Sequence, residues 1–195
     1  MELHVRRTLA ALAAFLLTLG PLAAVATSVV PLDIDQIVAG AQHVAHVRCT
    51  GNRVEPDSVV GVVTVTTFDV LDRAKGASGP VLIVRQPGGE RNGLHVNFHV
   101  PQFAVGEEYV LFMPAPSKAG LASPVGLSQG VFDVVPVRGG KEVGNGRDFA
   151  ELIPTVDPAK LPSGVAKRLQ LAPQERKRMD LGDFMALVRA KAGAR

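Results

Sequence analysis

The chain has 195 residues, with 21 Lys and Arg against 18 Asp and Glu and a formal net charge of +3. So small a balance excludes a protein that relies on a strong positive field to bind nucleic acid or an anionic membrane. The 20 glycines, 14 prolines and many valines favour strands joined by turns.

The first 26 residues have the order of a secretory signal peptide. Basic Arg6 and Arg7 precede an apolar run over 9–19, and Ala24-Val25-Ala26 provides a small-x-small cleavage pattern. The apolar run is shorter than the roughly 20 residues of a membrane-spanning helix. We therefore expect a signal peptide over 1–26, a secreted or periplasmic mature protein, and no transmembrane segment after its removal. The alternative is an uncleaved membrane anchor.

The mature chain predicts a β-rich domain over 27–137 that opens with a short helix. Asp33 and Gln36 have the spacing of a capping box, which predicts a helix over 33–41. Alternating or continuous apolar residues between Gly, Pro and Asn turns predict the strands that follow. The expected strands cover 43–54, 59–71, 81–86, 94–100, 109–113 and 125–137. The glycines after Pro87 predict a tight turn with positive φ.

Residues 138–195 differ in kind from this domain. Glycine turns surround a short polar arm over 139–146, and the chain is irregular over 148–160. Asp180 and Asp183 predict the cap of a final helix that carries Phe184 and Leu187. We expect an irregular arm and a C-terminal helical appendage.

Cys49 is the only cysteine, so the chain has no internal disulfide and must be stabilised by packing. Its place in a predicted strand indicates a buried small apolar residue. The alternative is an intermolecular disulfide or a reactive thiol.

Several segments occur in a definite order: 34–38 with 44–47, Phe68-Asp69-Val70-Leu71 with Lys75-Gly76, 84–89, 103–112 and 126–132. Taken in this order, they resemble a family of small exported bacterial proteins of unassigned function. More distantly, this order resembles the netrin-like or tissue-inhibitor-of-metalloproteinase-like OB-fold barrel. The resemblance covers about 33–135 and implies a mainly β, five- or six-stranded OB-like barrel or sandwich. Inhibitors of that fold use a cysteine-rich N-terminus, which the expected mature start at Thr27 lacks, so their mechanism is not implied.

Four histidines are the candidate metal ligands: His43, His46, His95 and His99. Imidazoles bind zinc or copper, but His95 and His99 lie about 13 Å apart if the segment is a straight strand. A single metal site therefore requires two of these segments to meet in space.

No catalytic constellation is apparent in the sequence. Ser128 has the Gly-x-Ser-x-Gly spacing, but no histidine follows it in the chain. Glu107 and Glu108 point to opposite faces if both lie on a strand, so they are not an acid–base pair. The glycine-rich segment 86–90 lacks the Lys of a phosphate loop.

The function expected from the sequence is a non-enzymatic, exported binding module for a protein or cell-envelope component. We expect no cofactor. We also expect no nucleic-acid partner for the basic residues over 168–178, because base stacking needs exposed aromatic side chains and most of the Phe and Tyr residues alternate onto core faces. The alternative is a metal-binding or metalloprotease-directed module that uses the four histidines.

Overall fold

The computed structural model describes residues 30–76, 79–154, 157–170 and 177–193, and residues 31–195 form one compact unit. The expected signal peptide, 1–26, and the expected mature start at Thr27 lie outside the described residues. None of the described helices is long and apolar enough to cross a membrane.

Strands predominate in the described chain up to residue 144, and helices predominate after it. In order they are α2 (Ile34–Gly40), β1 (His43–Asp57), β2 (Gly61–Lys75), β3 (Val81–Pro87), β4 (Gly89–Arg91), β5 (Leu94–Val96), β6 (Glu108–Met113), the 3-10 helix η1 (Leu127–Gly130), β7 (Val131–Val137), β8 (Gly140–Gly144), α3 (Phe149–Leu152), the 3-10 helix η2 (Pro158–Lys160), α4 (Ser163–Gln170), β9 (Met179–Asp180) and α5 (Leu181–Gly193).

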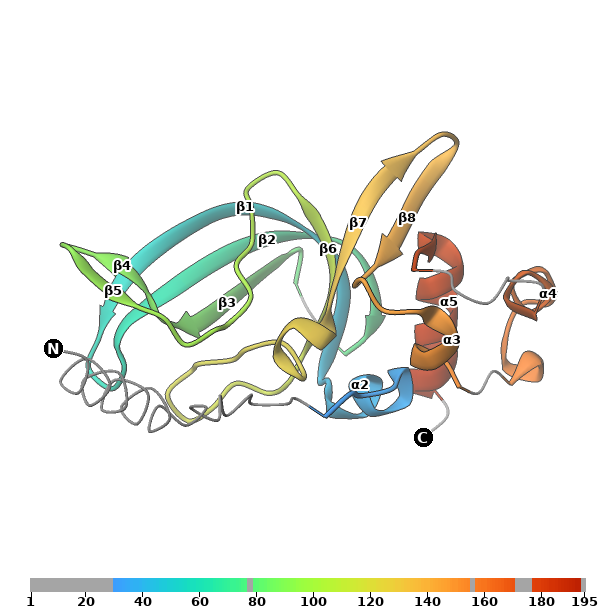
Figure 1. Ribbon diagram of the computed structural model, residues 1–195, viewed down its shortest axis with the longest axis horizontal. Coiled ribbons are helices and arrows are strands. Elements are labelled where there is room, and N and C mark those ends of the chain that lie inside the picture. The colour runs from blue at the N-terminus through green and yellow to red at the C-terminus, as the bar shows by residue number, and fades with distance from the viewer. Residues whose placement is uncertain (1–29, 77–78, 155–156, 171–176, 194–195) are drawn as a thin grey trace, which may run out of the picture. The chain divides into compact units, whose positions relative to one another are not determined.

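Seven of the described strands form an antiparallel sheet in the order β3-β2-β1-β6-β7-β8-β9, and β4 and β5 form a separate hairpin. The long strands β1 and β2 arch between the β4–β5 hairpin and the end of the molecule that carries α2 and α5 (Figure 1). Strand β6 returns after a long connection to pair with β1. The order β6-β1-β2-β3 is that of a Greek key.

The sheet is open, which corrects the expected five- or six-stranded barrel or sandwich. Strand β7 pairs with β6 on one side and with β8 along most of the other, and β3 pairs with β2 and not with β7. The outer edge of β3 is met by a loop, because the backbone N–H of Ala122 donates to the carbonyl oxygen of Arg85 at 2.9 Å. The expected mainly β class, the short N-terminal helix and the C-terminal helix are confirmed.

Hydrophobic cores lie on both faces of β6, because successive side chains of a strand point to opposite faces. Val110 and Phe112 belong to a core that α2, α3 and α5 complete with Ile34, Ile37, Phe149 and Phe184. Tyr109 and Leu111 belong to a second core with Val47, Cys49, Phe68, Val84 and Phe103. The sheet is therefore covered by helices on one face and by loops on the other.

The capping box predicted at the first helix is present. The backbone N–H of Gln36 donates to Oδ1 of Asp33 at 2.8 Å, and the backbone N–H of Asp33 donates to Oε1 of Gln36 at 2.9 Å. The apolar side chains Ile34, Ile37 and Val38 are buried. The capping hydrogen bonds begin the helix at Ile34, and the buried side chains orient it on the sheet.

The segment after residue 137, expected to be an irregular arm and appendage, contributes to the same compact unit. It supplies strands β8 and β9 to the main sheet. Phe184 of α5 is completely buried. The backbone N–H of Asp183 donates to Oδ1 of Asp180 at 2.9 Å, as the predicted cap requires.

Two expected strands are shorter than the sequence pattern indicated. The strand expected over 94–100 ends at Val96, because the backbone N–H of His99 donates to the Asn97 side chain and His99 has φ 55°. The strand expected over 125–137 begins at Val131, after left-handed residues at Gly126 and Leu127. Strand β1 extends instead to Asp57, through the expected turn.

Candidate functional site

A pocket of about 290 Å³ lies beneath the β4–β5 hairpin, and we call it the hairpin pocket. Strands β1, β2 and β3 and the segment that follows β5 provide its walls. The lining residues are Asn52, Val54, Thr64, Thr66, Gln86, Pro87, Gly88, Gly89, Glu90, His95, Val96, Asn97, Phe98, Val100, Pro101, Gln102 and Phe103.

Strands β1 and β2 place two bonded polar side chains in one wall of this pocket. Asn52 and Thr66 are register partners, and the Thr66 hydroxyl donates to Oδ1 of Asn52 at 2.7 Å. Nδ2 of Asn52 in turn donates to the carbonyl oxygen of Phe103 at 2.7 Å. Because Phe103 contacts Phe68 and Tyr109 edge to face, this chain of bonds ties the pocket wall to the second core.

Gln86 places a buried amide donor without a partner in the pocket wall. It is only 2% exposed, and its Nε2 makes no hydrogen bond within the described structure. Its register partner Thr64 donates instead to the carbonyl oxygen of Gly88 at 2.9 Å. A buried donor left without an acceptor costs about 1–3 kcal/mol. A ligand oxygen that reached Nε2 would remove this cost.

Two glycines allow the hairpin to fold over the pocket. Gly88 and Gly89 have φ of +100° and +136°, as expected of the predicted turn. A Cβ at Gly88 would lie 2.7 Å from the carbonyl oxygen of Val96, and a Cβ at Gly89 would lie 2.8 Å from Oγ1 of Thr64. Both the backbone angles and the close approach therefore require glycine here.

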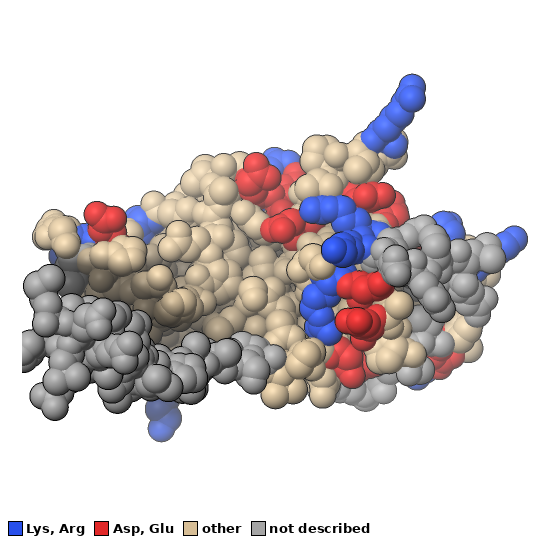
Figure 2. Space-filling view, in the orientation of Figure 1, with Lys and Arg blue, Asp and Glu red and all other residues tan. Residues whose placement is uncertain are grey.

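The pocket has little formal charge. Among its lining residues, Glu90 and His95 are the titratable ones, both exposed, and there is no Lys or Arg. Phe98 also lines the pocket and is 46% exposed. Figure 2 shows that the visible face between the hairpin and the helical end is mostly uncharged, whereas Lys, Arg, Asp and Glu gather near the helices.

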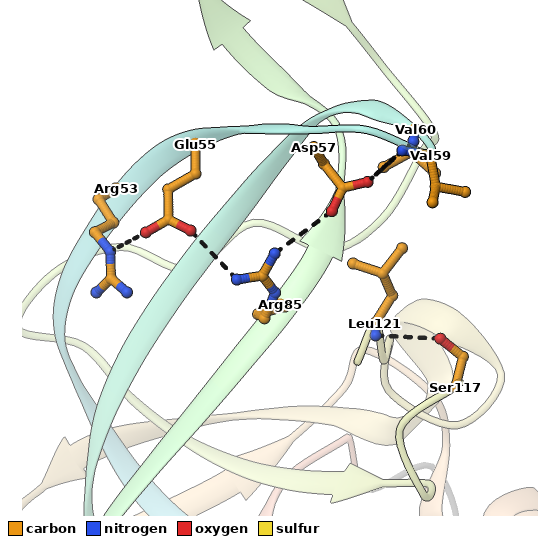
Figure 3. Close-up of polar contacts among 8 residues, drawn as sticks. All are labelled: Arg53, Glu55, Asp57, Val59, Val60, Arg85, Ser117 and Leu121. Atoms are coloured by element: carbon orange, nitrogen blue, oxygen red, sulfur yellow. Dashed lines mark hydrogen bonds and ion pairs between the residues drawn. The ribbon is translucent and has the colours of Figure 1, made fainter. Parts of the chain in front are cut away.

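An ion-pair network on the opposite face joins β3 to β1 across β2 (Figure 3). Arg85 of β3 reaches across β2 to Glu55 at 3.3 Å and to Asp57 at 3.5 Å. Arg53 contacts Glu55 at 2.6 Å, and its hydrogen bond lowers the pKa of that carboxyl. Since Arg85 and Gln86 are adjacent on a strand, fixing one on this face directs the other toward the pocket.

The four candidate histidines are divided between two regions. His43 and His46 lie on the first residues of β1, at the helical end, whereas His95 lies in the hairpin and His99 in the segment after it (Figure 1). No three His, Cys, Asp or Glu side chains of the described residues are grouped so as to hold a metal ion. A metal site built from these histidines stays a prediction from the sequence, without support from their placement.

Cys49 is 1% exposed within the second core, which confirms the expected buried apolar role. Burial raises the pKa of its thiol, because the thiolate is poorly solvated there.

Glu107 and Glu108 have different environments. Glu107 is exposed in the turn before β6. Glu108 begins β6 and contacts three basic side chains, those of His46, Arg48 and Lys141.

The residues of the hairpin pocket were not identified as a site by sequence reasoning. The sequence of β3 contained one indication of the pocket. Leu82, Val84 and Gln86 alternate onto one face of the strand, and Gln86 is the polar residue of that face. Alternation alone gave no indication that Asn52 and Thr66 would lie beside it.

No protein-family model matches this chain, and no curated protein matches it significantly.

Proposed function

We propose that this protein is an exported, non-enzymatic binding module that holds a protein or cell-envelope component at the hairpin pocket. The observation that carries the proposal is the buried donor of Gln86, left without a partner in the wall of an open pocket. Evolved interiors pair such groups, and a ligand would supply the missing acceptor.

The composition of the lining supports binding rather than catalysis. The described pocket has no Ser, Cys or Lys that could act as a nucleophile, and its single imidazole and single carboxylate belong to exposed residues. The amides, hydroxyls and apolar side chains that make up the rest of the lining orient a ligand through hydrogen bonds and apolar contact.

The Greek-key order supports a relationship to OB-like folds, which are partly open Greek-key barrels. On this proposal, β1, β2, β3, β6 and β7 form the OB-like part, and β8 and β9 extend the sheet where a barrel would close. The pocket then lies on the face of the sheet that an OB barrel turns inward.

Photo-crosslinking at the mouth of the pocket tests the binding function. A photoreactive phenylalanine analogue replaces Phe98 in one variant and Val137 of β7 in another, since the two side chains are 46% and 41% exposed. Irradiation in an extract of the native cell envelope should give a discrete adduct at position 98 and none at position 137. Equal labelling at both positions, or none at 98, would contradict the proposal.

Export is the second part of the proposal, and it follows from the order of charged, apolar and small residues over 1–26. Fractionation of cells that express the full chain should recover the protein outside the cytoplasm, with Thr27 as its first residue by N-terminal sequencing. Recovery of the intact N-terminus from the cytoplasm would overturn this part without affecting the binding test.

A further inference from the structure

We propose that the hairpin pocket binds one uncharged sugar ring of a neutral glycan, with Nε2 of Gln86 as a donor to a sugar oxygen. This inference rests on the proposed binding function and names the ligand class of the same pocket.

The charge of the residues that line the pocket disfavours anionic ligands. A bound phosphate or carboxylate is usually met by Arg, Lys or a cluster of backbone N–H groups. The described lining contains no Arg or Lys, and Glu90 belongs to it. Phosphorylated glycans, uronic acids and nucleic acids would therefore bring uncompensated negative charge next to Glu90.

The remaining lining matches the surface of a sugar. Asn52, Gln86, Asn97 and Gln102 provide amide groups, and Thr64 and Thr66 provide hydroxyls. Pro101 and Phe98 provide apolar surface beside these groups. A sugar ring presents hydroxyl groups at its edge and C–H groups on its faces, so it uses both kinds of surface at once.

The size of the pocket favours a single ring over a folded peptide segment. Its volume of about 290 Å³ is at the lower end of the range for small-molecule sites. The exposed Phe98 shows that the pocket opens to solvent near this side chain, so further sugar units can continue outside.

Gln86 gives the site its specificity. The amide is buried and its Nε2 has no partner, whereas the neighbouring Thr64 already donates to Gly88, so Nε2 is a buried donor that a ligand can satisfy. The Asn52–Thr66 pair is bonded within the wall and would keep its geometry when the ligand binds. A ligand acceptor at Nε2 thus completes the wall without breaking an existing bond.

The test uses the full chain, isotope-labelled, with two matched variants. Gln86→Met keeps the length of the side chain and removes the amide, whereas Gln42→Met makes the same change at an exposed position outside the pocket. The neutral probes are methyl α-glucoside and the methyl glycoside of N-acetylglucosamine. The comparison probes are glucuronic acid, glucose 6-phosphate and N-acetyl-trialanine amide. Chemical-shift titration gives the affinity and the residues affected, and thermal unfolding shows that each variant is folded.

We expect a neutral glycoside to shift the resonances of pocket residues, among them the Gln86 side-chain amide. Gln86→Met should weaken that binding about tenfold, and Gln42→Met should leave it unchanged. Tighter binding of the peptide amide or of a charged probe would overturn the sugar assignment and leave the binding function standing. Failure of both neutral glycosides to bind, or undiminished affinity in folded Gln86→Met, would also overturn it. Loss of the crosslink at position 98 would instead defeat the underlying function.

Discussion

Nε2 of His46 lies 2.8 Å from Oε2 of Glu108, and this contact joins β1 to β6 at the centre of the sheet. Arg48 contacts the other carboxylate oxygen at 2.7 Å, and Lys141 of β8 contacts Oε2 at 2.6 Å. Glu108 therefore links three strands that are far apart in the sequence. Burial raises the pKa of its carboxyl, but hydrogen bonds from Lys141, Arg48 and His46 outweigh burial and lower the pKa to about 2.

Glu108 should make the protein sensitive to acid. Because its folded-state pKa lies below the ordinary value of 4.5, its contribution is present above about pH 4.5 and is lost as the pH falls toward 2. Glu108→Gln should lower the free energy of unfolding at pH 7 by about 2 kcal/mol, allowing for the partial exposure of Arg48 and Lys141. Urea unfolding between pH 7 and pH 2.5 should show a flatter pH dependence in this variant.

Glu107→Gln is the matched control for that experiment, since it changes the neighbouring, exposed glutamate. It should reproduce the pH dependence of the wild type. An equal effect of the two substitutions would show that the Glu108 contacts do not stabilise the fold.

Gly88→Ala should destabilise the hairpin more than Gly61→Ala does. Both glycines have positive φ, but a Cβ at Gly61 would meet no atom within 4 Å, whereas one at Gly88 would lie 2.7 Å from a backbone oxygen. In chemical denaturation, we expect Gly61→Ala to lower the free energy of unfolding by about 1–2 kcal/mol and Gly88→Ala to lower it by about 2–5 kcal/mol. Comparable losses would mean that the close approach to Val96 is unimportant.

The thiol of Cys49 should be protected in the folded protein. Burial both blocks access and raises its pKa, so labelling by a thiol reagent at pH 8 should be on the order of a hundredfold slower than in urea. The control places a cysteine at the adjacent exposed position, as Thr50→Cys in a Cys49→Ala background. That variant should label rapidly when folded, and fast labelling of native Cys49 would contradict its burial.

Arg168 should hold α4 against α5. Its Nε donates to Oδ2 of Asp183 at 2.6 Å, and the Asp183 side chain is 7% exposed. Arg168→Gln leaves that carboxylate without its ionic partner, so the amides of α4 should exchange faster with solvent. Lys167→Gln, at the adjacent exposed position, is the control and should leave hydrogen exchange unchanged. Equal protection in the two variants would show that this ion pair does not hold α4 and that the apolar cluster around Val165 and Leu187 does.

Local features of the fold could be predicted because they depend on neighbours in the chain. Asp33 and Gln36 form their cap within one turn, and the residues of β6 alternate between two cores at the period of a strand. The strand expected over 94–100 was wrong for an equally local reason, since the backbone N–H of His99 donates to the Asn97 side chain and the left-handed conformation of His99 interrupts the apolar alternation.

The sequence by itself determined the mainly β class, the caps of the first and last helices, the burial of Cys49 and the glycine turn after Pro87. Only the tertiary structure decided that β8 occupies the free edge of β7, so that the sheet stays open. It also decided that Gln86 lies in a pocket wall with Asn52 and Thr66. These outcomes depend on pairing between distant strands, whose register is selected by burial of whole faces and not by the residues of any one segment.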